Sequence, residues 1–373
     1  MQFIDLKKQQ DQIRDKINKR ISKVLDHGKY IMGPEINELE SHLAKFTNVK
    51  HCISCSSGTD ALLIPLMAEG IGPGDAVITT PFTYIATAEV IKFVGATPVF
   101  VDIEPDTFNI DAYKIRNSIK IAKAKGLKVK AIIPVDLFGL PANYNQIYDN
   151  CSNEDLFIIE DAAQGFGGMI NEKKAGSFGT VGATSFFPAK PLGCYGDGGA
   201  IFTDDDNLFE VMKSIRVHGG GFDKYDNVRL GLNGRLDTIQ ATILLEKLSL
   251  FPVEIELRNK VAKYYSDNIP NYLNKPSVPE GFKSVWAQYS LLSESKEQRD
   301  SLISYLKRKE IPVMIYYRIP LHLQKVFSDL GYSKGDFPIS EDIADRVFSI
   351  PMHPYLEKND QDKIIEALIS FEK

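Results

Sequence analysis

A lysine in an unusually apolar setting is the first residue of this sequence that could carry chemistry. Lys190 lies within Ala183–Gly193, where apolar and small residues surround it, and the glycine-rich run Gly196–Gly199 follows. A lysine is ordinarily a solvated surface residue, but removal from water lowers the pKa of its amine. The deprotonated amine is a nucleophile for a carbonyl carbon. Lys190 is therefore a candidate for covalent chemistry.

Two other loops combine small or aromatic residues with the expected end of an apolar strand. Ser56–Ala61 precedes an apolar helix, and the N–H groups and dipole at a helix start favour a phosphate. Thr80–Tyr84 follows another apolar run, and the ring of Tyr84 could stack on a flat heterocycle. Each loop also has a structural interpretation, as a helix cap or as core packing.

Two acids end a third apolar run. Glu160 and Asp161 follow Phe157–Ile159, and small residues and Gln164 come next. An acid at a strand end suits contact with a metal or a cofactor, whereas a helix N-cap is the structural alternative, and the spacing leaves both open. A phosphate cradle, a carboxylate, an aromatic ring and a lysine are together the parts needed to hold pyridoxal phosphate.

The elements that must position these loops alternate between short apolar runs and longer helical patterns. Most of the runs lack polar alternation, which is typical of strands buried on both faces. We therefore predict an α/β fold, with a mostly parallel central sheet covered by helices on both faces. The last two runs leave no room for a helix and predict an antiparallel pair. The expected strands are Cys52–Ser54, Ala76–Thr79, Thr97–Val101, Ala131–Val135, Phe157–Glu160, Ala183–Phe186 and Ala200–Thr203.

Two amphipathic helices are expected in the first 50 residues, and a smaller α+β domain at the C-terminal end. We predict a large α/β domain over 1–250, including the N-terminal helices, and a small domain over 251–373. The C-terminal expectations are a helical connector over 236–269, strands over 284–292 and 311–317, and helices over 299–310 and 362–373.

Length and composition exclude several classes of protein. The 373 residues carry 44 basic and 49 acidic side chains, a net charge of −5, which argues against a protein that binds nucleic acid through its phosphates. We see no apolar run of the roughly 18–20 residues that a membrane-spanning helix needs and no signal peptide, so we expect a cytoplasmic protein. Cys52 and Cys55 lack a second pair, and we expect buried thiols rather than a metal site.

Almost the whole sequence resembles the DegT/DnrJ/StrS family of pyridoxal-phosphate-dependent sugar aminotransferases, which have fold-type-I architecture. Six motifs occur in the family's order. The fourth and fifth are most similar to the branch that aminates C3 of nucleotide-linked keto sugars. The motifs are SSGTDAL, TTPFTYIATAEVI, IEDAAQGFG, SFFPAKPLGCYGDGGA, GLNGRLDTIQA and IPLHLQ.

The resemblance implies roles for individual residues. Lys190 is the lysine that binds the cofactor covalently and moves a proton on it, and Asp161 pairs with the nitrogen of the cofactor ring. Gln164 flanks the ring near its 3-oxygen, and Tyr84 stacks on it. The remaining implied cofactor contacts, to the phosphate, are Gly58, Thr59, Ser185 and Asn233.

Asn233 corresponds to an asparagine that reaches the phosphate from the neighbouring subunit, which implies a homodimer with shared active sites. Arg235, in the same loop, matches an arginine suited to a substrate carboxylate, although relatives with non-acidic sugars also carry it. Tyr317 and His322 are the other expected substrate contacts, and a structural histidine is an equally good interpretation of His322. Tyr316–Arg318 replaces the His-Tyr-Pro of many relatives.

The implied reaction moves an amino group from L-glutamate to C3 of a nucleotide-linked keto sugar in surface polysaccharide (lipopolysaccharide O-antigen) biosynthesis. We favour UDP-2-acetamido-2-deoxy-3-keto-glucuronate. The alternatives are a dTDP-linked 3-keto-6-deoxyhexose and amination at C4. A sugar dehydrase would carry histidine in place of Lys190, and a non-catalytic regulator would have lost Lys190 or Asp161, so both are disfavoured.

Overall fold

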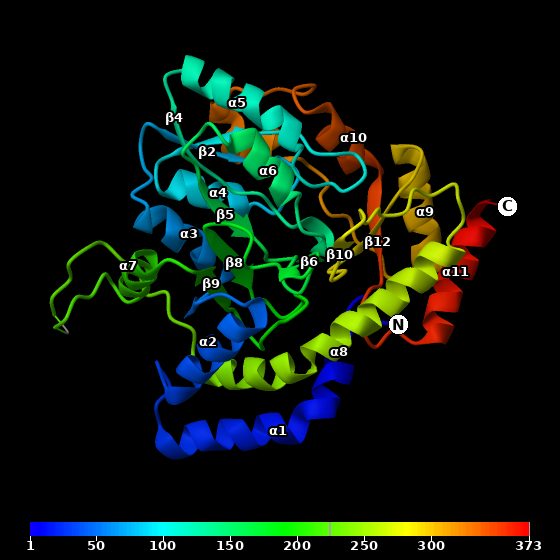
Figure 1. The fold of residues 1–373 in the computed structure, drawn as a ribbon. Helices are drawn as coiled ribbons and strands as arrows, with labels where there is room; N and C mark the ends of the chain where they lie inside the picture. Colours follow the sequence, from blue (N-terminus) through cyan, green and yellow to red (C-terminus); the bar gives the residue numbers. More distant parts are fainter. Residues whose placement is uncertain (224, 373) are drawn as a thin grey trace.

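The computed structural model describes residues 1–223 and 225–372 (Figure 1). Two N-terminal helices precede an α/β region, and a second group of helices and strands follows it. The elements of the first part are α1 (Leu6–His27), α2 (Pro34–Thr47), β1 (His51–Cys55), α3 (Gly58–Ala68), β2 (Asp75–Thr79), α4 (Ala86–Phe93), β3 (Thr97–Phe100), α5 (Ala112–Ala124), β4 (Lys128–Ile132), α6 (Tyr144–Cys151), β5 (Phe157–Asp161), β6 (Met169–Ile170), β7 (Lys173–Lys174), β8 (Val181–Ser185), β9 (Gly199–Thr203) and α7 (Asp206–Arg216).

Seven strands form the central sheet, in the order β1-β9-β8-β5-β4-β2-β3. The ladders joining β3, β2, β4, β5 and β8 are parallel, while β9 runs antiparallel to both β8 and β1. The expected α/β fold is confirmed, and so is the antiparallel pairing of the last two expected strands, which are β8 and β9. The fourth strand begins at Lys128, three residues before the expected start at Ala131.

Helices cover both faces of the sheet because successive strand residues point to opposite sides. Ile159 of β5 packs in one apolar cluster with Leu62 of α3 and Ile215 of α7. Its neighbour Ile158 packs in another cluster with Ile147 of α6. Each face of β5 is therefore buried, which is why its sequence lacks alternating polar residues.

The long helix α8 (Thr238–Asn268) connects the sheet region to the C-terminal elements (Figure 1). It runs without interruption through residue 250, so the expected domain boundary falls inside a helix. The elements after it are β10 (Phe282–Lys283), β11 (Tyr289–Leu292), α9 (Lys296–Arg308), α10 (Pro338–Arg346), β12 (Val347–Ile350) and α11 (Lys358–Glu372).

One expected strand is wrong. Residues 311–317 form no strand; only Met314 makes an isolated bridge, to Ser349. β11 pairs antiparallel with β12, which lies outside the expected strands. Pro312 lacks the N–H group that a ladder needs, and an apolar run by itself does not distinguish a strand from a buried irregular segment.

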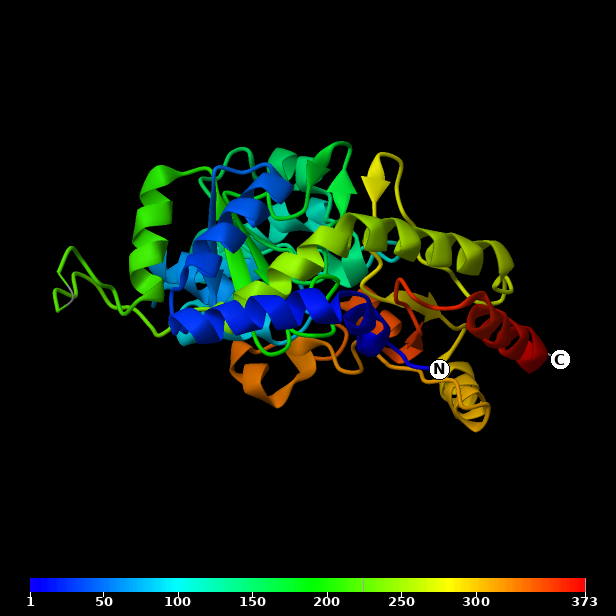
Figure 2. The same ribbon diagram turned by 90° about the horizontal axis from the view of Figure 1, so that it is seen from below.

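The C-terminal part packs back onto the sheet region, as Figure 2 shows for the orange segment below it. The Leu321 N–H donates to the Pro81 carbonyl oxygen at 2.7 Å. Asp102 accepts hydrogen bonds from the backbone N–H and the hydroxyl of Ser340. These contacts bring C-terminal residues close to the loop that carries Tyr84. No helix in the described part of the chain is long and apolar enough to cross a membrane.

Candidate active site

The predicted site residues follow the carboxyl ends of neighbouring strands. Asp161 ends β5, Ser185 ends β8, Gly58 lies just beyond β1, and Tyr84 lies just beyond β2. In an open α/β sheet, ligands bind outside this edge, where the loops turn into helices. The fold therefore gathers side chains that are more than 100 residues apart in sequence.

Asp161 is a buried carboxylate held by two donors. Its Oδ2 accepts a hydrogen bond from the Thr87 hydroxyl at 2.8 Å, and its Oδ1 accepts one from the Ala163 N–H at 3.2 Å. Burial raises the pKa of Asp161, while Thr87, Ala163 and the positive charge of Lys190 counteract this rise. Asp161 is thus an acid that needs a cationic partner to stay ionised.

Lys190 faces this carboxylate across the site. Burial lowers the pKa of its amine, and the charge of Asp161 counteracts the decrease. The Nζ atom has no hydrogen-bond or ion-pair partner among residues 1–223 and 225–372, whereas the backbone N–H is fixed by the Phe187 carbonyl at 2.9 Å. A fixed backbone and an unpaired, partly desolvated amine are what a nucleophilic lysine requires.

The start of α3 offers free backbone donors next to β8. The Ser57 hydroxyl accepts the Asp60 N–H at 3.1 Å, while Ser56 Oγ donates to the Asp60 carboxylate. This cap leaves the N–H groups of Gly58 and Thr59 without acceptors in the described chain. A Cβ on Gly58 would lie 2.5 Å from the Ser185 Cβ, so only glycine allows this close approach. The geometry suits a phosphate.

Gln164 connects the sheet region to the C-terminal part. Its Oε1 accepts the Phe138 N–H at 2.9 Å, and its Nε2 donates to the Tyr317 hydroxyl at 3.0 Å. Tyr317 also packs edge-on against Phe82, and burial raises the pKa of its hydroxyl. Tyr317, one of the expected substrate contacts, is therefore brought to the site.

Three expected contacts lie at the rim. Tyr84 is 57% exposed, Asn233 is exposed, and Arg235 is partly buried with an Nε atom that has no partner in the part of the chain described. The Gly234 carbonyl accepts the Ser56 N–H at 3.0 Å, so the Asn233 loop lies against the start of α3.

Residues 11–369 match the DegT/DnrJ/EryC1/StrS aminotransferase family. The chain belongs to this family. It is 46% identical to the UDP-2-acetamido-2-deoxy-3-oxo-D-glucuronate aminotransferase of Pseudomonas aeruginosa, over 96% of each chain. It is 41% identical to the pleiotropic regulatory protein of Geobacillus stearothermophilus, over 99% of this chain and 98% of that one. It is 38% identical to the UDP-N-acetyl-3-dehydro-alpha-D-glucosamine 3-aminotransferase of Acidithiobacillus ferrooxidans, over 98% and 96%.

Solved structures of similar proteins have the same fold. A DegT/DnrJ/EryC1/StrS aminotransferase from Brucella abortus has a TM-score of 0.96 at 50% identity, covering 100% of this chain and 99% of that one. NtdA of Bacillus subtilis, with bound cofactor PMP, has a TM-score of 0.89 at 28% identity, covering 99% and 83%. A sugar aminotransferase of Streptococcus pneumoniae in its PLP form has a TM-score of 0.88 at 25% identity, covering 95% of each chain.

His322 makes its contacts with other residues of the C-terminal part. The ring is 2% exposed, Nε2 lies 3.0 Å from the Glu341 carboxylate, and the ring packs edge-on against Phe337. Burial lowers its pKa, and Glu341 opposes that shift. These contacts favour the structural interpretation of His322 over its predicted role as a substrate contact.

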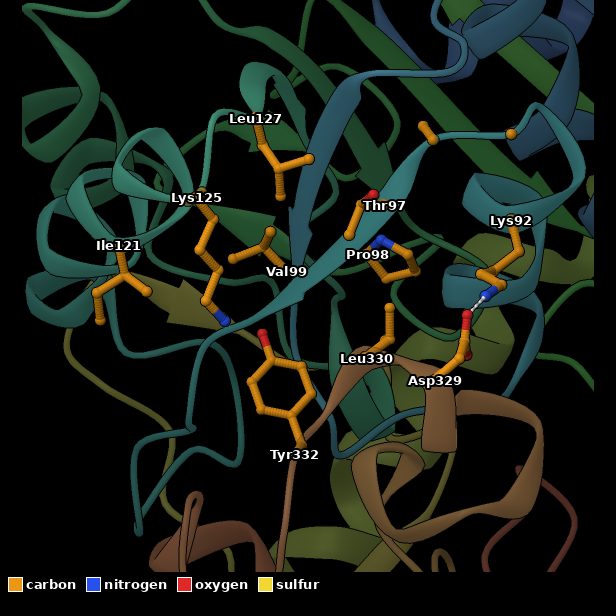
Figure 3. Close-up of a pocket in the computed structure, with 13 residues that line it drawn as sticks. Lys92, Thr97, Pro98, Val99, Ile121, Lys125, Leu127, Asp329, Leu330 and Tyr332 are labelled. Carbon is orange, nitrogen blue, oxygen red and sulfur yellow. Dashed lines mark hydrogen bonds and ion pairs between the residues drawn. The ribbon is translucent and has the colours of Figure 1, made fainter.

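The candidate active site is distinct from a cavity of about 490 Å³ at the edge strand β3 (Figure 3). Lys92, Lys125 and Tyr332 line this cavity, and none of the predicted site residues does. The edge strand itself is protected, because Pro98 has no N–H and the Phe100 N–H donates to the Tyr332 hydroxyl at 3.3 Å.

All four cysteines are free and buried, and burial raises the thiol pKa of Cys52 and Cys55. No metal-binding cluster of His, Cys, Asp and Glu occurs within the described ranges.

Two residues that contact the site residues were not predicted from the sequence, namely Thr87 and Phe138. Their partners are distant in sequence, and neither residue type indicated a chemical role in its motif.

Proposed function

We propose that this chain is a pyridoxal-phosphate-dependent aminotransferase that transfers an amino group from L-glutamate to C3 of a UDP-linked keto sugar. The observation that carries the proposal is the unpaired, desolvated amine of Lys190 facing the buried carboxylate of Asp161. The residues present also fit the cofactor's phosphate, because Gly58 and Thr59 offer free N–H groups in a space too tight for a Cβ. The cofactor supplies an electron-accepting ring when it is bound.

Each side chain has a separate task in this proposal. Lys190 would hold the cofactor covalently, and its free amine would be a base that can move a proton. Asp161 would hold the proton on the ring nitrogen, because a buried carboxylate is stabilised by an adjacent cation. Gln164, held by the Phe138 N–H, would flank the ring, and the exposed side chain of Tyr84 would be available to stack on the ring.

The preferred acceptor is UDP-2-acetamido-2-deoxy-3-keto-glucuronate. Two of the relatives are named for 3-keto sugars linked to UDP, and the one at 46% identity is named for the glucuronate. The partly buried guanidinium of Arg235 has an unpaired Nε and offers a partner for the sugar carboxylate. A dTDP-linked 3-keto-6-deoxyhexose is the alternative, since relatives named for dTDP sugars reach 36% identity.

We further propose a cytoplasmic homodimer in which Asn233 completes the partner's site. Asn233 is exposed, as are Phe222 and Leu230 in the segment that follows α7. Figures 1 and 2 show this segment extending away from the body of the molecule. Exposed apolar side chains on an extended segment are suited to contact with a second copy.

An absorption spectrum before and after addition of L-glutamate tests the reaction. Bound cofactor should give a band near roughly 410–430 nm that glutamate shifts to roughly 330 nm, and a keto sugar that accepts the amino group should restore it. Lys190→Ala should abolish the shift. A protein that shows no band after incubation with pyridoxal phosphate would overturn the proposal, and the regulatory role of the Geobacillus relative would become the better candidate.

Arg235→Ala tests the choice of sugar. We expect kcat/KM for the UDP-linked 3-keto-glucuronate to fall at least tenfold, because a charged hydrogen bond of about 1.5–3 kcal/mol is lost. The loss for a dTDP-linked 3-keto-6-deoxyhexose, which has no carboxylate, should be much smaller. Equal losses for the two sugars would contradict the carboxylate role.

A further inference from the structure

Two buried acids face each other directly beneath the candidate site. Asp136 and Glu160 are both fully buried, and their carboxyl groups lie within hydrogen-bonding reach of each other. Glu160 precedes Asp161 on β5, so its side chain points to the opposite face of the sheet. Neither acid has a role in the proposed reaction.

The donors around the pair are unequally distributed. Glu160 accepts hydrogen bonds from the backbone N–H groups of Gly176 and Phe178, the latter at 2.6 Å. On Asp136, Oδ1 accepts the Ala142 N–H at 2.9 Å and the Tyr144 hydroxyl at 3.0 Å. The other oxygen, Oδ2, is buried without a donor.

A proton between the two carboxyl groups accounts for this arrangement. Two carboxylates in contact cannot both stay ionised in a buried site, and one shared proton turns the orphan oxygen into a donor. The negative charge then belongs to Glu160, which has the backbone donors, and the proton to Asp136. The other ionisable groups that face the pair are Tyr144 and Tyr148 of α6, and neither is a cation.

The pKa directions agree with this geometry. Burial and the neighbouring charge of Glu160 hold the pKa of Asp136 well above its usual range. Burial raises the pKa of Glu160 to about 7, although its backbone donors oppose the rise. Both acids therefore retain protons more strongly in the folded chain than in the unfolded chain.

Asp136 also supports two cofactor-site residues. Its N–H donates to the Asp161 carbonyl at 3.0 Å. Its carboxyl group fixes the loop up to Ala142, from which the Phe138 N–H reaches Gln164. A Cβ on Gly165, next to Gln164, would lie 2.3 Å from the Asp136 Cβ, so the turn packs directly on this side chain.

We propose that Asp136 and Glu160 share one proton and that the protonated pair is the positioning element that holds Gln164 and Asp161 in place. The existence of the shared proton does not depend on the proposed function, whereas the positioning role rests on the proposed function. Asp136 is thus a positioning residue, because it acts on the cofactor through Gln164 and Asp161 rather than by contact.

Urea unfolding of the full chain against pH tests the shared proton. Asp136→Asn keeps both acceptor contacts on its Oδ1 and donates from Nδ2 to Glu160, but it cannot lose a proton. From about pH 6 upward, the unfolding constant of the natural chain should rise up to tenfold more per pH unit than that of D136N, because unfolding of the natural chain releases the proton of Asp136. Asp149→Asn, at an exposed carboxyl of α6, should keep the natural pH dependence.

Equal pH dependence of the natural chain and D136N would overturn the shared proton. Should D136N fail to fold, infrared spectroscopy of the natural chain decides the question. A carbonyl band of a protonated carboxyl group should be present at neutral pH and disappear at alkaline pH. Its absence at neutral pH would overturn the proposal.

The positioning role has its own measurement, the affinity for pyridoxal phosphate by absorbance titration. D136N should bind within about threefold of the natural chain at neutral pH, and unlike the natural chain it should keep that affinity at alkaline pH. D136A, which loses the contacts to Ala142 and Tyr144, should bind at least tenfold more weakly. Natural affinity in D136A would refute positioning. Failure of the natural chain to bind would instead refute the proposed function and leave the unfolding result intact.

Discussion

The substitution Gly58→Ala tests the phosphate cradle at the start of α3. The new Cβ would lie 2.5 Å from the Ser185 Cβ, 3.0 Å from its Oγ and 3.2 Å from its Cα, all shorter than ordinary carbon contacts. Overpacking of this kind costs about 1–3 kcal/mol. The ordinary Gly-to-Ala gain in a helix is about 0.5–1 kcal/mol, so the change should be destabilising.

Urea unfolding and cofactor titration measure the two consequences separately. We expect G58A to lose about 1–2 kcal/mol of stability and at least tenfold in affinity for pyridoxal phosphate, because the free N–H groups of Gly58 and Thr59 must shift. Gly72→Ala is the matched control, since its new Cβ would be 3.6 Å from the Val94 carbonyl, an ordinary contact.

A double substitution distinguishes this collision from other effects of the alanine. Ser185→Gly removes the Cβ that the new methyl group meets, so the G58A/S185G chain should recover much of the stability lost by G58A. Natural stability and natural cofactor affinity in G58A would refute the reasoning, because the two loops would then lie farther apart than described. Additive losses in the double variant would place the cost elsewhere.

Three further predictions concern buried polar contacts. Arg216→Met should lower the free energy of unfolding in urea by about 3–5 kcal/mol, because the Glu40 carboxylate, 2.6 Å from Arg216 Nη1, loses its cation. Full stability in R216M would contradict a buried ion pair. Tyr317→Phe should cost about 1 kcal/mol and weaken cofactor binding, because the Gln164 Nε2 loses its acceptor; an unchanged cofactor Kd would contradict this. Asp161→Asn should abolish transamination yet stabilise the cofactor-free chain, increasingly as pH rises above about 4, where this carboxyl group ionises in the unfolded chain, because burial raises its pKa in the folded chain. A stability gap independent of pH would refute this prediction.

The sheet could be predicted because its strands depend on local sequence. Runs such as Phe157–Glu160 are apolar without alternation, and they form strands covered on both faces. The boundaries were less accurate, as β4 begins three residues before the expected run. The C-terminal pairing of β11 with β12 could not be predicted, because the segment 311–317 is apolar for another reason: Ile311, Val313 and Ile315 pack into the C-terminal core without a ladder.

The candidate site also has residues that could be predicted from local sequence and residues that could not. Lys190 and Asp161 could be identified from their unusual apolar surroundings and their place at strand ends. Their partners could not, because Thr87 lies 74 residues from Asp161 and Tyr317 lies 153 residues from Gln164. Such contacts depend on how α4 and the C-terminal part pack against the sheet, and no local pattern encodes that packing.

The adjacent acids at the end of β5 show how the alternating direction of side chains along a strand determines which residue of a motif faces the site. The sequence offers Glu160 and Asp161 side by side without indicating which one serves a ligand. Because successive side chains of a strand point to opposite faces, the two acids have different surroundings. Asp161 meets Thr87 and the amine of Lys190, whereas Glu160 meets backbone donors and Asp136. Alternation therefore gives Asp161 to the ligand site and leaves Glu160 to the proposed proton-sharing pair with Asp136.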